Sequence, residues 1–178
     1  MKILKFLVLG LFFVFGAARA DNLVVYFSDS GNTERVANII HENVGGGIAR
    51  INPVVAYPES YNEKTDVAKQ EQQENARPAY QDLGVNVSNY DTVFLGYPNW
   101  WGGMPMIIYT FLENNDLGGK TIIPFVTHEG SGFGDSVEEI KRVAPGANVM
   151  DGFALRGGDP LHDDVSDVVK DLLKQIGK

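Results

Sequence analysis

Apolar runs and helical stripes alternate along the chain after its first 20 residues. The run at residues 23–27 is apolar throughout, as a strand buried on both faces of a parallel sheet requires. Residues 34–44 carry apolar side chains at helical spacing until three glycines end the pattern. The same analysis predicts strands at 48–51, 92–97, 121–126 and 148–155, and helices at 104–112, 135–143 and 165–176.

Residues 58–77 differ from the rest of the chain. This stretch is polar, rich in Glu and Gln, and only weakly periodic. It predicts an exposed, partly helical excursion, which is placed to cover a site formed by its neighbours.

Strand and helix in strict alternation predict a parallel sheet with helices on both faces. Such sheets bind ligands beyond the carboxyl ends of their strands, where the strand order reverses. The loops after the first, third and fourth strands are therefore the segments to examine for function.

The first 20 residues have the three parts of a signal peptide. Lys2 and Lys5 form a positive start, residues 6–15 are apolar except for one glycine, and residues 18–20 read A-R-A. An apolar run of ten residues is half of the ~20 that span a bilayer. We expect cleavage after Ala20 and export to the periplasm, leaving a domain at 21–178 without a membrane span. A buried helix or an uncleaved anchor is the alternative.

The composition of the chain excludes several kinds of site and partner. Cysteine is absent from the 178 residues, which excludes disulfides, thiolate metal sites and cysteine nucleophiles. After residue 20 there are 12 basic and 23 acidic residues, a net charge of −11, whereas nucleic-acid binders carry a basic face. No pattern in the sequence predicts a metal site or a catalytic side chain.

The loop after the first strand, residues 28–33, contains three hydroxyls, one glycine and no cation. Small hydroxylic residues at a helix N-terminus offer O–H and backbone N–H donors together, which suits a phosphate. The lysine of a nucleotide-hydrolysing P-loop is missing, so a phosphomonoester fits better than a triphosphate. Ordinary helix capping by Ser30 or Thr33 is the alternative.

Both tryptophans of the protein, Trp100 and Trp101, lie in the loop after the third strand. Adjacent side chains of a regular element point to different sides, so at least one indole is expected near the surface. An indole at the carboxyl end of a strand is a suitable wall for a flat ring. An aromatic patch that contacts a protein partner is the alternative.

The loop after the fourth strand, residues 128–134, has three alternating glycines, which allow close approach of a ligand to the backbone. Its G-x-G-x-G spacing differs from the dinucleotide fingerprint, and Ser131 is outside a nucleophile elbow. His128 lacks the second histidine of a zinc-protease motif and is interpreted as a loop histidine. His41 and His162 are assigned no chemistry.

Three motifs resemble the flavodoxin family, and most closely its members with a Trp-Trp loop. They are VVYFSxSGNT at 24–33, FLGYPxWWG at 94–102 after Tyr90-Asp91, and PFxTHxGSG at 124–132. They follow the appropriate strands in order, and the resemblance covers nearly all of the chain after residue 20.

The resemblance implies a flavodoxin-like, doubly wound α/β domain whose five parallel strands have the order 2-1-3-4-5, with bound FMN. The first loop would bind the phosphate, and the other two would flank the isoalloxazine ring. The implied cofactor-binding residues are Ser28, Ser30, Gly31, Asn32, Thr33, Pro98, Asn99, Trp100, Trp101, Gly102, His128, Glu129, Gly130, Ser131, Gly132 and Phe133.

The chain departs from the family in two places. One is the first loop, where the family pattern is T-x-T-G-x-T, and the other is the third loop. Serine replaces threonine at the first two hydroxyl positions, which keeps the donors. The third loop lacks the tyrosine that stacks on the ring in many flavodoxins, so Phe133 or no residue covers that face.

Three functions remain open at this point. An electron carrier would exchange electrons with redox partner proteins through an exposed flavin edge, as the small size and acidic surface favour. An NAD(P)H-dependent FMN oxidoreductase would pass electrons to a quinone or similar acceptor, as the Trp-Trp loop and the excursion at 58–77 favour. The third function is a binding module without cofactor, because export in the unfolded state would leave FMN behind.

Overall fold

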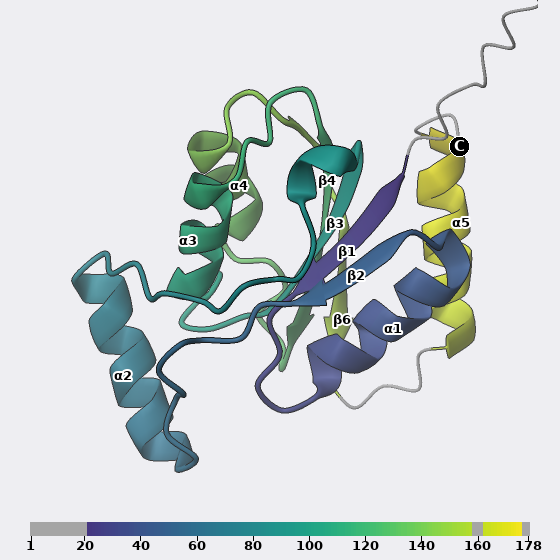
Figure 1. Ribbon diagram of the computed structural model, residues 1–178. Helices are drawn as coiled ribbons and strands as arrows, with labels where there is room; N and C mark the ends of the chain where they lie inside the picture. The colour runs from purple at the N-terminus through teal and green to yellow at the C-terminus, as the bar shows by residue number, and fades with distance from the viewer. Residues whose placement is uncertain (1–20, 158–161, 176–178) are drawn as a thin grey trace, which may run out of the picture.

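In the computed structural model, which describes residues 21–157 and 162–175, a parallel sheet lies between two layers of helices (Figure 1). Its strand order is β2-β1-β3-β4-β5, with β6 also paired to β4, which confirms the predicted order. The predicted signal peptide lies outside the described residues. The strands are β1 (Asn22–Tyr26), β2 (Gly47–Arg50), β3 (Thr92–Pro98), β4 (Thr121–His128), β5 (Asn148–Val149) and β6 (Phe153–Arg156).

The helices cover the sheet in two pairs, α1 with α5 on one face and α3 with α4 on the other (Figure 1). A short 3-10 helix, Val87–Asn89, precedes β3. Helix α3 begins two residues later than predicted because Pro105 occupies its N-cap. The helices are α1 (Asn32–Val44), α2 (Tyr61–Gln73), α3 (Met106–Asn114), α4 (Ser136–Val143) and α5 (His162–Gln175).

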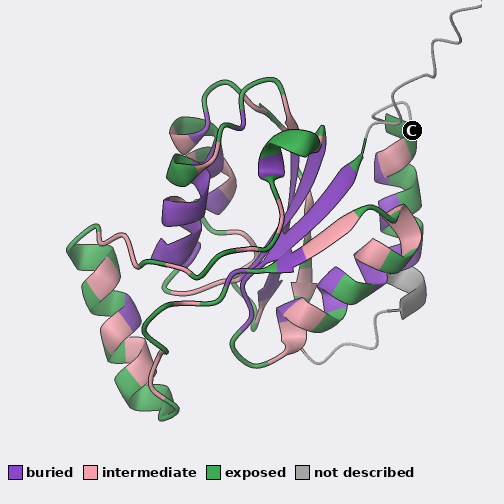
Figure 2. Ribbon diagram, viewed as in Figure 1, coloured by how far each residue is buried: buried purple, intermediate pink, exposed green. Residues whose placement is uncertain are grey.

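Alternate residues of the buried strands supply two separate cores. Leu23 and Val25 of β1 pack with Ile107 and Ile140 under α3 and α4. Val24, between them, packs on the opposite side with residues of α1 and α5. The unbroken apolar runs of the sequence thus correspond to strands covered on both faces (Figure 2).

The predicted continuous strand at 148–155 is wrong in one respect, because it is divided into β5 and β6. Both segments run parallel to β4, with Ile122 opposite Val149 and Phe125 opposite Phe153. One extra residue therefore lies between the two paired stretches. Gly152 occupies the break with φ +66°, and a Cβ there would lie 1.9 Å from the Pro124 carbonyl oxygen.

The stretch predicted to be a partly helical excursion forms a regular helix of 13 residues, α2. It projects from the body of the molecule, and most of its surface is exposed or half-buried (Figures 1 and 2). Ala68 is its buried residue. After the helix, Arg77 forms an ion pair with Glu113 of α3, with 2.7 Å between Nε and Oε2. No helix in the described part of the chain is long and apolar enough to cross a membrane.

Candidate functional site

The three loops singled out from the sequence meet at the carboxyl ends of β1, β3 and β4. They meet because β3 pairs with both β1 and β4. Asn99 donates through Nδ2 to the Gly132 carbonyl oxygen over 2.9 Å, which joins the second loop to the third. The hydroxyls of Thr33 and Thr127 share a buried hydrogen bond of 2.8 Å, which joins the first loop to β4.

The first loop leads into α1 through an N-cap residue that has no side chain. Gly31 is the N-cap, so neither Ser30 nor Thr33 caps the helix as the alternative interpretation required. The Ser28 Oγ accepts the Glu34 N–H over 3.2 Å, and a hydroxyl that accepts can still donate its proton. Ser30 is exposed, whereas Thr33 is buried. Together with the N–H groups of the first helical turn, these hydroxyls form a donor set suited to an anion.

Two acids near this loop are paired with cations from other elements. Arg50, at the end of β2, donates to Glu34 Oε2 over 3.1 Å and to the Ser28 carbonyl oxygen over 2.8 Å. Lys64 of α2 lies 2.7 Å from Asp29 Oδ2. The loop itself has no cation, yet two cations flank it.

Trp100 and Trp101 have different surroundings, as the sequence predicted. Trp100 is half-buried and packs edge-on against Phe27 and Tyr57, with ring centroids 5.4 and 5.1 Å away. Trp101 is 51% exposed and has φ +52°, a strained conformation for a bulky residue. Its Nε1 donates to the Thr65 carbonyl oxygen of α2 over 3.0 Å.

The third loop presents its first residues to solvent and its end to the core. Glu129, Gly130 and Ser131 are exposed. The Gly130 N–H donates to His128 Nδ1 over 2.8 Å, so His128 serves as an oriented loop histidine. Phe133 is half-buried and packs against the core under α3 and α4.

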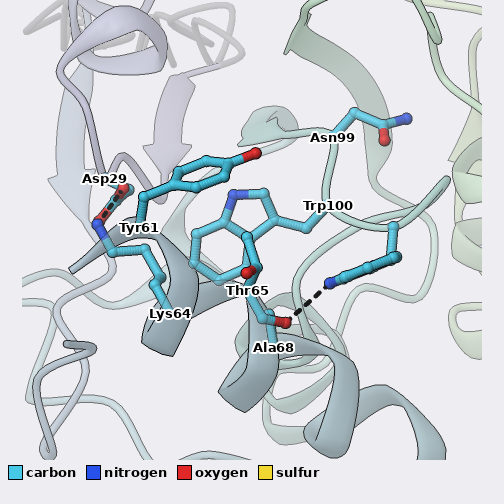
Figure 3. Close-up of a pocket in the computed structure, with 8 residues that line it drawn as sticks. Asp29, Tyr61, Lys64, Thr65, Ala68, Asn99 and Trp100 are labelled. Atoms are coloured by element: carbon cyan, nitrogen blue, oxygen red, sulfur yellow. Dashed lines mark hydrogen bonds and ion pairs between the residues drawn. The ribbon is translucent and has the colours of Figure 1, made fainter. Parts of the chain in front are cut away.

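A cavity of about 390 Å³ lies between α2 and the first two loops (Figure 3). Its volume is within the range of small-molecule sites. In the close-up, the Trp100 indole lies among the lining residues, with Tyr61 beside it and Lys64 at one end. The lining residues are Asp29, Tyr61, Lys64, Thr65, Ala68, Asn99, Trp100 and Trp101.

Four of these residues, Tyr61, Lys64, Thr65 and Ala68, come from α2 and were not predicted from the sequence. The only indication in the sequence was the polarity of residues 58–77, which shows that this stretch lies outside the core. Helix α2 now forms one wall of the cavity, in agreement with the expectation that this excursion covers the site.

A polar pair connects α2 to the aromatic cluster. Tyr57 donates to Glu71 Oε2 over 2.9 Å, and its ring contacts Trp100. Burial raises the pKa of the Glu71 carboxyl, although its bond from Tyr57 acts in the opposite direction. Burial, followed by the nearby Glu71 charge, also raises the pKa of Tyr57. The hydrogen bond thus joins α2 to the aromatic ring that contacts Trp100.

Similarity to known proteins agrees with this arrangement of loops. The sequence model of a family described as Flavodoxin matches residues 21–172. The chain belongs to the flavodoxin family. No curated protein matches it at a significant level.

Solved structures resemble this flavodoxin over most of its length. A candidate flavoprotein from Bacteroides eggerthii DSM 20697 is 34% identical, with a TM-score of 0.77 over 89% of this chain and 98% of that one. A flavoprotein from Lactobacillus acidophilus NCFM, solved in complex with FMN, is 23% identical, with a TM-score of 0.63 over 85% and 99%. Flavodoxin 2 from Bacillus cereus is 21% identical, with a TM-score of 0.57 over 88% and 99%. The last two show the shared fold.

Proposed function

We propose that this protein binds FMN and transfers electrons through it. The observation that carries the proposal is the start of α1, where the N-cap residue Gly31 has no side chain to bond the first N–H groups, at the same sheet edge as the Trp100–Trp101 loop. A phosphate and a flat ring are the two ends of FMN. The FMN-bound Lactobacillus acidophilus relative supports the same assignment.

The residues present fit each end of the cofactor. The hydroxyls of Ser28 and Ser30 and the N–H groups of α1 before Glu34 would hold the phosphate, because Gly31 has no side chain that competes for them. The Glu34 N–H is already bonded to Ser28 Oγ. The indole of Trp101 would contact the isoalloxazine ring, because it is exposed at the neighbouring loop. When bound, FMN itself supplies the redox chemistry.

The chain's part is to bind and orient the cofactor and to adjust its reduction potential. An apolar indole beside the ring excludes water on that side. A net charge of −11 after residue 20 makes the addition of further negative charge less favourable. Both effects lower the reduction potential of a bound flavin.

Calorimetric titration of the apoprotein with FMN and with riboflavin tests this proposal. Replacing Ser30 by Ala removes one donor, which we expect to weaken FMN binding by about tenfold or more. Riboflavin, which lacks the phosphate, is expected to bind the variant and the wild type equally. Ser131→Ala, an exposed serine of the third loop, is the matched control and is expected to leave the FMN-to-riboflavin ratio unchanged. Equal losses for both flavins in Ser30→Ala would show that this loop does not bind the phosphate.

An NAD(P)H-dependent oxidoreductase is the second candidate, and the cavity beside Trp100 and Trp101 favours it. The cavity of about 390 Å³ is partly open to solvent, so a small donor or acceptor can reach a ring held beside Trp101, which exchange with a partner protein does not require. Mixing the FMN-loaded protein with NADH and a quinone distinguishes the two candidates. Rapid NADH oxidation that depends on the quinone supports the enzyme, and its absence supports the carrier.

We further propose that the protein is exported and that the mature chain begins at Asp21. The positive start, the apolar run and the A-R-A sequence before this residue support the proposal. N-terminal sequencing of protein from its native compartment tests it, and an intact Met1 would contradict it.

A further inference from the structure

The first loop, residues 28–33, contains an acid that would repel the phosphate proposed to bind there. Asp29 lies between the Ser28 and Ser30 hydroxyls. A phosphate monoester carries about 1.5 to 2 negative charges at pH 7. A carboxylate in the middle of the loop therefore repels the ligand unless a cation neutralises it.

Helix α2 supplies that cation. Lys64 Nζ lies 2.7 Å from Asp29 Oδ2, and the two side chains are only 17% and 29% exposed. Figure 3 shows this ion pair at one end of the cavity. An ammonium group has three N–H donors, so one can bind Asp29 while the other two remain for a second acceptor.

The other cation beside the loop, Arg50, is not among the residues that line the cavity. Both terminal nitrogens of Arg50 are engaged, one with Glu34 Oε2 and one with the Ser28 carbonyl oxygen. Arg50 therefore fixes the shape of the loop. Lys64 is the cation that lines the cavity.

We propose that Lys64 determines specificity for the phosphorylated flavin. It neutralises Asp29 and donates to the phosphate, so that α2 provides the positive charge that the loop sequence lacks. This inference rests on the proposed binding of FMN.

The same helix also contacts the ring side of the site. Thr65, the next residue, accepts the Trp101 Nε1 hydrogen bond. One turn further, Lys69 Nζ lies 4.9 Å from the centre of the Trp101 ring. Helix α2 thus connects the two ends of the cofactor site, with Lys64 at the phosphate and Lys69 at the indole.

Lys69 provides a matched control, because it is a second lysine on α2 that faces the indole instead of the loop. Calorimetry of the apoproteins with FMN and with riboflavin compares Lys64→Gln, Lys64→Arg, Lys69→Gln and the double variant Asp29→Asn/Lys64→Gln. Riboflavin binding by each variant also reports whether it is folded.

We expect Lys64→Gln to weaken FMN binding by about tenfold or more and to change riboflavin binding little. Lys64→Arg should keep FMN affinity, because it keeps the charge. The double variant should bind FMN more tightly than Lys64→Gln, because the uncompensated carboxylate is gone. Lys69→Gln should change the affinities for the two flavins by the same factor.

Two results would overturn the inference. Lys64→Gln could weaken both flavins equally, which would mean that Lys64 only holds α2 in place, or it could leave FMN affinity unchanged. Flavin binding by the wild-type protein tests the proposed function separately. A wild-type protein that binds neither flavin would contradict FMN binding itself, and the role of Lys64 with it.

Discussion

The two tryptophans differ in packing and in exposure. Trp100 contacts Phe27 and Tyr57 edge-on and is half-buried, whereas Trp101 is 51% exposed and contacts α2 through its N–H group. Trp101 also has φ +52°, and strained residues of this kind are concentrated at functional sites. The residue with the less favourable backbone is therefore the one that we propose contacts the flavin ring.

Replacing each tryptophan by Ala should therefore have different effects. Trp100→Ala removes a half-buried ring from an aromatic cluster and should lower the free energy of unfolding by about 2–4 kcal/mol. Trp101→Ala should change the free energy of unfolding by less than about 1 kcal/mol, since its side chain is exposed. It should weaken flavin binding by about 1–3 kcal/mol, as for aromatic stacking on nucleic-acid bases.

Urea unfolding of the apoproteins and calorimetric titration with FMN measure the two effects. Trp101→Gly is a useful control, because glycine adopts a positive φ without strain. It should bind flavin as weakly as Trp101→Ala and be at least as stable. Flavin affinity that depends on Trp100 instead would contradict the assignment of roles.

Glu71 makes the attachment of α2 dependent on pH. Its pKa is raised by burial above the usual value of 4.5, so the native state retains its proton at a pH where the unfolded chain has lost it. The free energy of unfolding therefore falls as pH rises between the unfolded pKa and the raised native pKa. Above the native pKa, the cost of a charged, half-buried carboxylate is fully present.

Glu71→Gln should remove this dependence while it keeps an acceptor for Tyr57. Urea unfolding of both proteins across this window should show the wild type losing stability relative to Glu71→Gln as pH rises. Glu113 and Glu139 have their pKa lowered, chiefly by hydrogen bonds from Arg77 and Arg142, and act in the opposite direction. They are present in both proteins, so the difference isolates Glu71. Parallel pH profiles would show that Glu71 does not titrate in this window.

At the scale of elements, the second and third loops are held against each other at a close backbone contact. Asp135 donates its N–H to the Gly102 carbonyl oxygen over 3.2 Å. Gly134, with φ +55°, lies so near that a Cβ would be 1.7 Å from this oxygen. The contact fixes the Trp101 loop relative to the third loop.

Gly134→Ala should therefore separate the two loops. We expect it to lower the free energy of unfolding by more than Gly132→Ala, its matched control. Gly132 also has a positive φ, but a Cβ there meets no atom within 4 Å, so only backbone strain of about 1 kcal/mol is added. Thermal unfolding and FMN titration of both variants check this expectation. Equal effects would mean that the close contact is not needed.

The predicted elements agree with the structure to within three residues at each end, except at the divided fifth strand. The buried strands could be predicted because a strand covered on both faces needs an apolar side chain at every position. The break between β5 and β6 depends on how closely Gly152 approaches Pro124 of the neighbouring strand, which a local pattern does not report. Helix α2 was weakly periodic because it buries only Ala68.

The candidate site shows the same division. Its three loops were predicted because parallel strands bring their carboxyl ends to one edge of the sheet. The pairs Asp29–Lys64 and Tyr57–Glu71 join residues 35 and 14 positions apart, through a helix that no core pattern locates. The contribution of α2 to the cavity could thus be found only from the structure, whereas the loops could be predicted from the sequence.

At the scale of the whole molecule, an acidic chain is proposed to bind an anionic cofactor. After residue 20 its net charge is −11. The long-range field therefore disfavours FMN, and local donors and the cation Lys64 must offset it. A moderate rise in ionic strength should therefore not weaken FMN binding, because salt screens the long-range repulsion more than it screens the partly buried Asp29–Lys64 pair. Titrations at two salt concentrations test this prediction.

Tryptophan fluorescence during titration of the apoprotein with FMN tests the central claim most directly. The only two tryptophans lie in the loop proposed to contact the ring, so the signal has a single origin. The account predicts that FMN quenches most of the emission and that quenching saturates at one FMN per chain. Binding of FMN with the emission unchanged would contradict it, and would make the Trp100–Trp101 loop a surface for a protein partner instead.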